Sequence, residues 1–327
     1  MIHPLTMNRR EALAGTVGAA LAVASGCAFA QNDRPLRMYV GFPPGGSGDL
    51  FARILADAMR EDLQQPILVE NKPGAGGMTV AVGFLRAPKD GNHLMLATGS
   101  TAVAAPISRA KAPYRPIEDF QWLALLSNAP FVVAVNPSLP VRTLPELVEY
   151  AKARPGKLSY GHAGLGTTVY LAGELLKDRA GINVVDVAYA GSAPAITDTI
   201  AGNVQYVIET TGTLGPYAKA GKLRIITCMA EAREKIAPDV PTSREAGYDL
   251  VAGTYNLLAV PAGTPPEAIN RLAQAASRAM EKPAVQERLA SLGITPVTNS
   301  SPEQARAFMH SEVTRWSAVT KKLGIAL

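Results

Sequence analysis

Five short segments rich in glycine, serine and threonine are the parts of this 327-residue sequence best suited to chemistry. They lie where strand-like runs give way to helical patterns, at 43–49, 72–79, 98–102, 161–168 and 189–195. The first N–H groups of a helix have no partner inside the helix, and the helix dipole adds partial positive charge there. Glycine lets the backbone approach a ligand closely, and hydroxyl groups add further donors. Together the segments predict a site for a small anion that needs no arginine.

For any single segment, an ordinary helix cap with its turn is the simpler explanation. Asp49, for example, is a good N-cap residue whatever its loop binds. Several such segments at the carboxyl ends of strands, where open α/β sheets bind ligands, favour the anion site.

Residues typical of catalytic sites are sparse. Beyond the first thirty residues only His93, His162 and His310 remain, and none belongs to an HExxH zinc motif. The sequence has no CxxC pair and no GxSxG nucleophile elbow, and the 43–49 segment lacks the lysine of a P-loop. We therefore expect no enzymatic activity, no metal and no cofactor. A periplasmic hydrolase or isomerase that uses His162 and Glu209 is the alternative.

The first thirty residues have the pattern of an export signal. Arg9 and Arg10 precede an apolar stretch of small residues that ends at Ala28-Phe29-Ala30, as in a secretory signal peptide. We expect cleavage after Ala30 and a periplasmic mature protein. The arginine pair leaves twin-arginine export open beside the general secretory route. Cys27 leaves open a lipid anchor, for which the residues before it are a poor match.

Composition limits the partners and the sources of stability. The chain is 47% hydrophobic and 18% charged, which is enough for a sizeable core in about two lobes. Once the leader is removed, Cys228 is the remaining cysteine, so no internal disulfide can form. The formal net charge of +5 comes without a basic stripe or interleaved aromatic residues. We therefore expect no nucleic-acid partner and a monomer that attracts small anions.

Strand-like and helix-like runs alternate along almost the whole chain, which predicts parallel sheets covered on both faces by helices. One series begins with a strand at 36–42, and a second begins with a strand at 131–137. A late strand then leads into helices at 283–291 and 302–323, which indicates that the chain returns to its first lobe. We expect a signal peptide at 1–30, lobe 1 at 31–129 plus 253–327, and lobe 2 at 130–252.

Several motifs in order resemble the Bug family, the extracytoplasmic solute receptors of tripartite tricarboxylate transporters. They include FPPGGSGD, VENKPGAGG, YAGSAPAITDTIAGNVQ and VPAGTPPEAINRL, and the resemblance runs from about Arg37 to the C-terminus. It implies a two-lobed, type II (Venus-flytrap) periplasmic binding protein of α/β class, with parallel-rich mixed sheets covered by helices. It also implies a small carboxylate ligand, such as a dicarboxylate, an acidic amino acid or an aromatic acid. The implied partners are membrane permease subunits, and a ligand sensor that feeds a signalling protein is the alternative.

The resemblance further implies which residues hold the carboxylate through loop N–H groups, hydroxyls and ordered water. The matched positions are Pro44, Gly45, Gly46, Ser47, Asp49, Ser100, Thr101, Gly164, Gly166, Thr167, Thr168, Gly191, Ser192, Glu209 and Tyr255. His162 stands where the family often has a small residue, and Ala190 replaces a frequent lysine. These departures favour a less charged or aromatic ligand. We include His162 in the site, with a hydrogen bond inside its own turn as the alternative.

Overall fold

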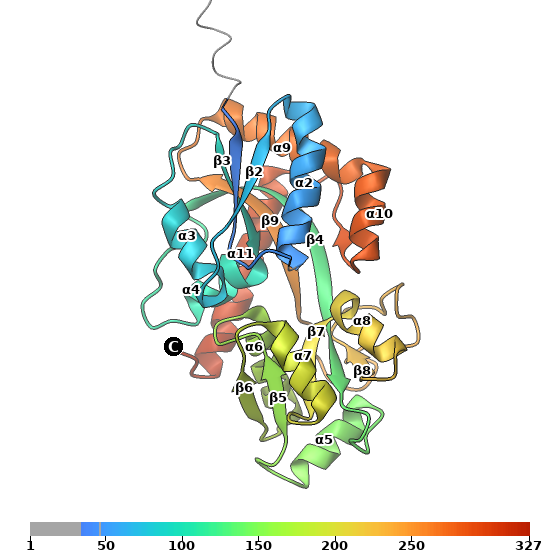
Figure 1. Ribbon diagram of the computed structural model, residues 1–327. Helices are drawn as coiled ribbons and strands as arrows, with labels where there is room; N and C mark the ends of the chain where they lie inside the picture. The colour runs from blue at the N-terminus through green and yellow to red at the C-terminus, as the bar shows by residue number, and fades with distance from the viewer. Residues whose placement is uncertain (1–33, 46) are drawn as a thin grey trace, which may run out of the picture.

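The computed structural model describes residues 34–45 and 47–327 (Figure 1). The expected signal peptide, Cys27 and Gly46 lie outside the described residues. The described chain forms two lobes joined by a long strand, β4, which runs from Phe120 to Val135. We use lobe 1 for the elements from β1 to α4 together with those from β9 to α11, and lobe 2 for the elements from α5 to β8.

Lobe 1 is built on a mixed sheet in the order β2-β1-β3-β9-β4. β1 is parallel to β2 and β3, whereas β9 is antiparallel to both β3 and β4. The short β10 pairs with β4. The strands other than β4 are β1 (Leu36–Val40), β2 (Ile67–Asn71), β3 (His93–Thr98), β9 (Gly253–Pro261) and β10 (Thr295–Pro296).

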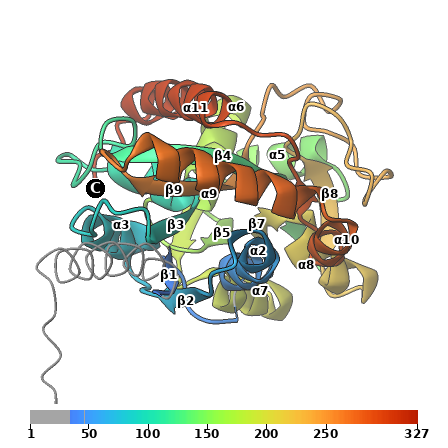
Figure 2. The same ribbon diagram turned by 90° about the horizontal axis from the view of Figure 1, so that it is seen from above.

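Helices cover both faces of this sheet because its strands alternate their side chains between two cores. Leu94 and Leu96 pack in one core with α2, α9 and α10, while Met95 and Ala97 face the core that contains α3 and α11. Seen from above, α11 lies on the opposite side of the molecule from α2 (Figure 2). The helices are α2 (Ser47–Leu63), α3 (Met78–Phe84), α4 (Ala105–Ile107), α9 (Pro266–Glu281), α10 (Pro283–Ser291) and α11 (Pro302–Lys322).

Lobe 2 repeats the pattern on a smaller scale. β5 is parallel to β6 and β7, while β7 and β8 are antiparallel to the end of β4. α5 and α6 share the larger core with lobe 1, and α7 and α8 pack on the opposite face. The strands are β5 (Ser159–His162), β6 (Val185–Ala188), β7 (Tyr206–Thr210) and β8 (Arg224–Cys228). The helices are α5 (Leu144–Lys152), α6 (Thr168–Ala180), α7 (Ser192–Ala201) and α8 (Thr211–Lys219).

β4 corrects one expectation about the elements. The sequence pattern places the start of this strand at residue 131, but the strand begins at Phe120. Its first part pairs with β9 and its last part with β7 and β8, so one continuous apolar run serves both lobes. The pairings through β4 are antiparallel, so the parallel pairs lie in the rest of the sheet on either side of it.

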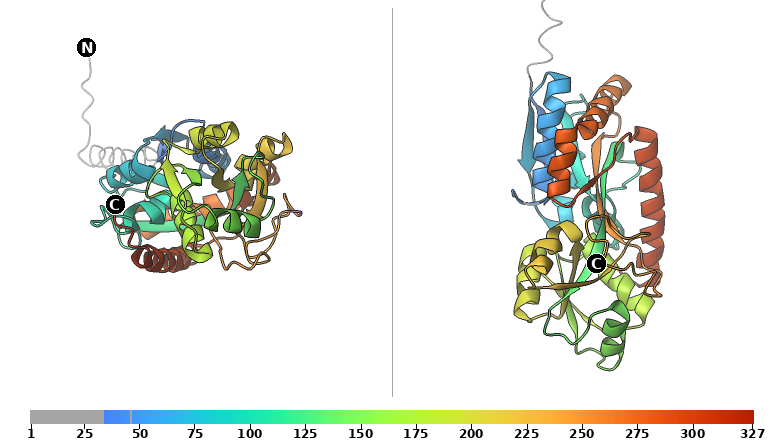
Figure 3. Two further views of the ribbon diagram at one scale, coloured as in Figure 1. Left: turned by 90° about the horizontal axis from the view of Figure 1, so that it is seen from below. Right: turned by 90° about the vertical axis from the view of Figure 1, so that its right-hand side faces the viewer.

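The connection between the lobes lies where β9 begins, since Gly253 of β9 is opposite Pro130 of β4. The lobe boundaries at 129/130 and 252/253 stay a prediction. α11 runs along one side of the molecule from lobe 1 toward lobe 2 (Figure 3, right). In the described part of the chain, none of the helices combines the length and apolarity needed to cross a bilayer.

Candidate functional site

Asp49 fixes the shape of the proline- and glycine-rich loop at the start of α2. Its buried carboxylate accepts hydrogen bonds from Gly45 N at 2.9 Å, Arg53 Nε at 3.0 Å and Asn71 Nδ2 at 3.0 Å. Burial alone would raise the pKa of Asp49, but these donors outweigh it and lower the pKa. All of these partners belong to lobe 1, so Asp49 holds the loop in place and its own oxygens are already occupied.

The loop that Asp49 holds is exposed at Pro43, Pro44 and Gly45, and α2 begins directly after it, at Ser47. Gly45 has a φ of 81°, which favours glycine. The start of α2 points toward the lobe that carries α7 and α8 (Figure 1). The first-lobe segment expected to bind a ligand therefore faces the other lobe.

Ser100 and Thr168 meet across the two lobes. Ser100 lies in a π-helical turn after β3, and Thr168 is the first residue of α6. Ser100 Oγ accepts a hydrogen bond from Thr168 N at 3.1 Å and lies 3.2 Å from Thr168 Oγ1. A free helix-terminal N–H of lobe 2 is thus satisfied by a hydroxyl of lobe 1.

Thr101 sits behind this contact. Its Oγ1 is buried and has no hydrogen-bond partner among the described residues. A Cβ placed on Gly77 would lie 1.9 Å from this oxygen, and Gly77 has a φ of 90°. Only glycine fits here, so the 72–79 segment, which follows β2, packs directly on the 98–102 segment, which follows β3, although β1 separates the two strands in the sheet.

The 161–168 segment turns sharply before α6. Gly164 and Gly166 have φ values of 115° and 72°, and Thr167 caps the helix by accepting a hydrogen bond from Tyr170 N at 3.3 Å. Thr167 Oγ1 also donates to Gly164 O at 2.6 Å. A Cβ on Gly76 of lobe 1 would lie 3.5 Å from Gly166 O. The segment therefore lies against lobe 1, with much of its hydrogen-bonding capacity used within the protein.

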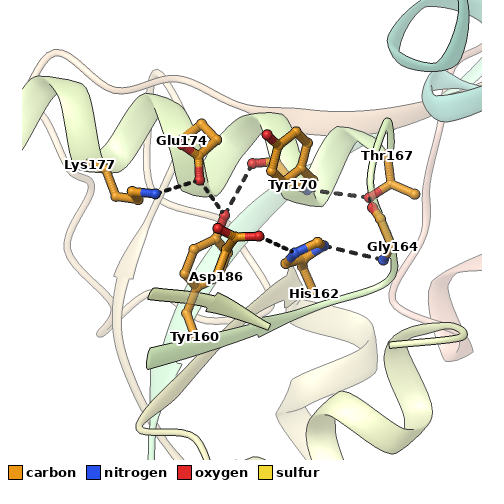
Figure 4. Close-up of polar contacts among 8 residues, drawn as sticks. All are labelled: Tyr160, His162, Gly164, Thr167, Tyr170, Glu174, Lys177 and Asp186. Atoms are coloured by element: carbon orange, nitrogen blue, oxygen red, sulfur yellow. Dashed lines mark hydrogen bonds and ion pairs between the residues drawn. The ribbon is translucent and has the colours of Figure 1, made fainter. Parts of the chain in front are cut away.

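His162 is engaged at both ring nitrogens inside lobe 2 (Figure 4). Nδ1 accepts a hydrogen bond from Gly164 N at 3.2 Å, and Nε2 lies 3.4 Å from Asp186 Oδ2 on β6. The hydrogen bond inside its own turn, which the sequence left open as an alternative, is therefore present. Burial lowers the pKa of His162, while the Asp186 carboxylate acts in the opposite direction.

Ser192 and Glu209 form a second polar contact, at the starts of α7 and α8. Ser192 Oγ donates to Glu209 Oε1 at 2.6 Å, and Thr210 N donates to Glu209 Oε2 at 3.0 Å. Burial raises the pKa of Glu209, with these donors opposing the shift. Gly191 has a φ of 124°, and no side chain in the described structure caps α7 or α8. Glu209 thus orients Ser192 beside the N-termini of α7 and α8, where neither N-cap residue caps its helix through its side chain.

Tyr255 supports the site from behind. It lies on β9, buried, with its ring in an edge-on contact with Phe308 at 4.8 Å between centroids. A Cβ on Gly99 would lie 3.2 Å from Tyr255 Cζ and 3.0 Å from Thr168 Cγ2. Burial raises the pKa of Tyr255 well above its usual value, and the Glu312 carboxylate adds to this. The Tyr255 ring therefore packs against the turn that contains Ser100.

Two further contacts between the lobes were missed by sequence reasoning. On the side of α8 and α10, a Cβ on Gly212 would lie 2.6 Å from Gly293 Cα and 2.4 Å from Leu292 O. On the side of α6, Lys322 Nζ of α11 pairs with Asp178 Oδ2 at 2.6 Å. Isolated glycines and surface charges give no signal of such pairings, because their partners are distant in the sequence. The lobes therefore touch on both sides of the molecule (Figure 1).

Comparisons with known proteins agree with this architecture. Residues 51–325 match the model of the tripartite tricarboxylate transporter family receptor. Protein BugT of Bordetella pertussis is 34% identical over 296 residues, which cover 90% of each chain.

Two solved structures from Rhodopseudomonas palustris are also similar. One, determined with adipate, is 28% identical in sequence with a TM-score of 0.83. The match covers 90% of this chain and 98% of that protein. The other, MatC with bound malate, is 31% identical in sequence with a TM-score of 0.81. The match covers 88% of this chain and 98% of that protein. The resemblance to the Bug family and the two-lobed fold are thereby confirmed. The chain belongs to the tripartite tricarboxylate transporter receptor family, whose members are periplasmic binding proteins.

Proposed function

We propose that the protein is a periplasmic receptor that binds a small carboxylate between its lobes and delivers it to the permease subunits of a tripartite transporter. The observation that carries this proposal is the hydrogen bond from Thr168 N to Ser100 Oγ at 3.1 Å. In this contact, the N-terminus of a helix in one lobe donates a hydrogen bond to an oxygen of the other lobe, and no arginine or lysine takes part in it. A carboxylate oxygen between α2, α7 and α8 would meet donors of the same kind.

The ligand class follows from the donors and from the relatives. In this proposal, the N–H groups that begin α7 and α8 and the exposed loop before α2 contact the acid, while Ser192 stays bound to Glu209 beside them. Two similar proteins are described with the dicarboxylates adipate and malate. Hydrogen bonds to a charged group contribute about 1.5–3 kcal/mol each. Four to six of them, offset by the cost of association, correspond to binding on the order of micromolar.

Binding and closure are linked in this proposal. The donors of lobe 2 reach the ligand only when the lobes meet, so the ligand stabilises the closed form. The permease would then recognise that form. Export through the N-terminal signal places the receptor in the periplasm.

The protein acts on its ligand by holding it, without catalysis. An enzyme would need a free base in the site, but both nitrogens of His162 have partners within lobe 2. Glu209 is likewise bound to Ser192 and Thr210. These contacts favour the receptor over the hydrolase or isomerase.

Isothermal titration calorimetry of the mature protein with malate, adipate, glutamate and benzoate tests the proposal. The diamides of malate and adipate serve as uncharged controls of nearly the same shape. We expect micromolar binding of at least one acid and none of its amide. Binding of sugars or metal ions without binding of any acid would overturn the proposal, and chemical conversion of a bound acid would favour the enzyme.

A further inference from the structure

His162 lies at the end of β5 with 1% of its surface exposed, in a polar cluster that faces the underside of α6 (Figure 4). The groups around its ring come from each neighbouring element. Tyr160 of β5 and Tyr170 of α6 have ring centroids 5.5 and 5.1 Å from the imidazole, and Asp186 of β6 faces Nε2. Glu174 of α6 also lies in this cluster, where it accepts from Tyr160 Oη at 3.1 Å and from Lys177 Nζ at 2.8 Å.

The contacts of the ring define its protonation state. Gly164 N can donate to Nδ1 only if Nδ1 carries no proton. Nε2 then carries the proton and points it toward Asp186 Oδ2 at 3.4 Å. A proton added at Nδ1 would face the N–H of Gly164, so the hydrogen bond at 3.2 Å would be lost. The turn after β5 is therefore compatible only with a neutral ring.

A short series of contacts connects this ring to the other lobe. Gly164 N is bound to His162, and Gly164 O accepts from Thr167 Oγ1 at 2.6 Å. Thr167 caps α6, and the next residue, Thr168, donates its N–H to Ser100 Oγ at 3.1 Å. The shape of the 162–168 turn thus determines where the N-terminus of α6 meets lobe 1.

We propose that His162 is a positioning residue whose neutral imidazole holds the 162–168 turn in the shape that lets α6 contact Ser100, and that protonation of Nδ1 releases this turn. This inference extends the proposed receptor function. Only one consequence, that acid weakens ligand binding, rests on that function. The part that concerns the turn rests on the contacts of His162 alone.

The direction of the pKa shift of His162 agrees with release of the turn by acid. Burial lowers the pKa of His162, although the Asp186 carboxylate opposes the shift. The contribution to stability is then fully present above the unfolded-state pKa of about 6.5 and is lost as the pH falls toward the folded-state value. Release is therefore expected on the acidic side of neutrality.

Two substitutions of His162 distinguish the role of Nδ1 from that of Nε2. His162→Asn keeps an acceptor near the Nδ1 position and cannot be protonated, whereas His162→Gln keeps a donor toward Asp186 but places no acceptor at Nδ1. His310→Gln, on the exposed side of α11, is the matched control. Hydrogen exchange of the Gly164 and Thr168 amides, corrected for the intrinsic rate at each pH, reports on the turn in the ligand-free protein.

We expect the wild type to lose protection of both amides by about tenfold as the pH falls from 8 through the pKa of His162, which its ring ¹⁵N shifts measure, as for the loss of one hydrogen bond. His162→Asn should keep its protection at pH 5, His162→Gln should lack it at every pH, and His310→Gln should follow the wild type. Equal protection in His162→Gln and wild type at pH 8 would overturn the proposal.

If a variant fails to fold, the ring ¹⁵N shifts of wild-type His162 test the proposal, because they report which ring nitrogen carries the proton. An unprotonated Nδ1 with a protonated Nε2 at pH 8 is expected, and the opposite tautomer would also overturn the proposal. Calorimetry with malate and adipate at pH 8 and pH 5 forms a separate arm. Absence of binding of these two acids and of glutamate and benzoate at both pH values would count against the receptor function and would leave the exchange result for the turn unchanged.

Discussion

At the scale of single residues, Asp49 and His162 share a feature that their loops alone do not reveal. Each is almost completely buried, and each directs its polar atoms to backbone or side-chain groups of its own lobe. Because those atoms are already engaged, both residues shape the loops that the ligand would contact. The backbone N–H groups of the loops and of the starts of α7 and α8 remain as the groups proposed to contact it.

Asp49→Asn should lower the free energy of unfolding at pH 7 by about 1–3 kcal/mol, because donors that now face a carboxylate would face an amide. The half-exposed Arg53 adds little to this, since solvent screens its ion pair. The lowered pKa of Asp49 means that its stabilisation is present above the unfolded-state value of about 3.9 and is lost as the pH falls through the folded-state value. Urea unfolding at pH 7 and pH 3 measures both effects.

Asp57→Asn, at an exposed position of the same helix, is the control for the loss of a negative charge. A destabilisation as large as that of Asp49→Asn would contradict the role assigned to the buried carboxylate.

At the scale of elements, the N-terminus of α6 shows how a helix end can serve two purposes. Thr167 caps it from within lobe 2, and Ser100 satisfies its first N–H from lobe 1. The starts of α7 and α8 have no such caps in the described structure. In the proposed function, these two helix ends supply donors for the anion, whereas α6 contributes to closure.

Ser100→Ala should weaken binding of a carboxylate about five- to tenfold, because the closed form would bury the N–H of Thr168 without a partner. In the open form water can satisfy that N–H, so the stability of each lobe should change little. Calorimetry with the acid that binds most tightly measures the affinity, and thermal unfolding without ligand measures stability. Ser311→Ala, at an exposed position of α11, should leave both unchanged. Unaltered affinity in Ser100→Ala would show that this contact does not contribute to closure.

At the scale of the whole molecule, the lobes meet through small residues on one side and through polar contacts on the other. Gly212 of α8 and Gly293 after α10 approach so closely that neither accommodates a Cβ without movement. Ser100, Thr168 and the Lys322–Asp178 pair lie on the side of α6. The structure is therefore that of a receptor with its lobes in contact.

Gly212→Ala should favour the open form, since its methyl group would lie 2.4 Å from Leu292 O. Alanine is a better helix former than glycine by about 1 kcal/mol, so the isolated lobe should be as stable as before or more so. We expect a larger radius of gyration by small-angle scattering and an affinity for carboxylates reduced at least tenfold. Gly215→Ala is the matched control, because it lies in the same helix and a Cβ there meets no atom within 4 Å. Equal compactness of the two variants would refute the prediction.

The sequence by itself determined the α/β class and the loops at the ends of strands, because hydrophobic periodicity and glycine-rich turns are local signals. The family followed from the resemblance of several motifs in order along the chain. It also contained both explanations of His162, a ligand contact and a hydrogen bond inside its turn. Tertiary structure decided which donors the protein uses itself. Ser100 and Thr168 are 68 residues apart in the chain, and no local pattern links them. The close approach of Gly212 to Gly293 and the full length of β4 depend in the same way on how two lobes pack, which is a property of long-range contacts.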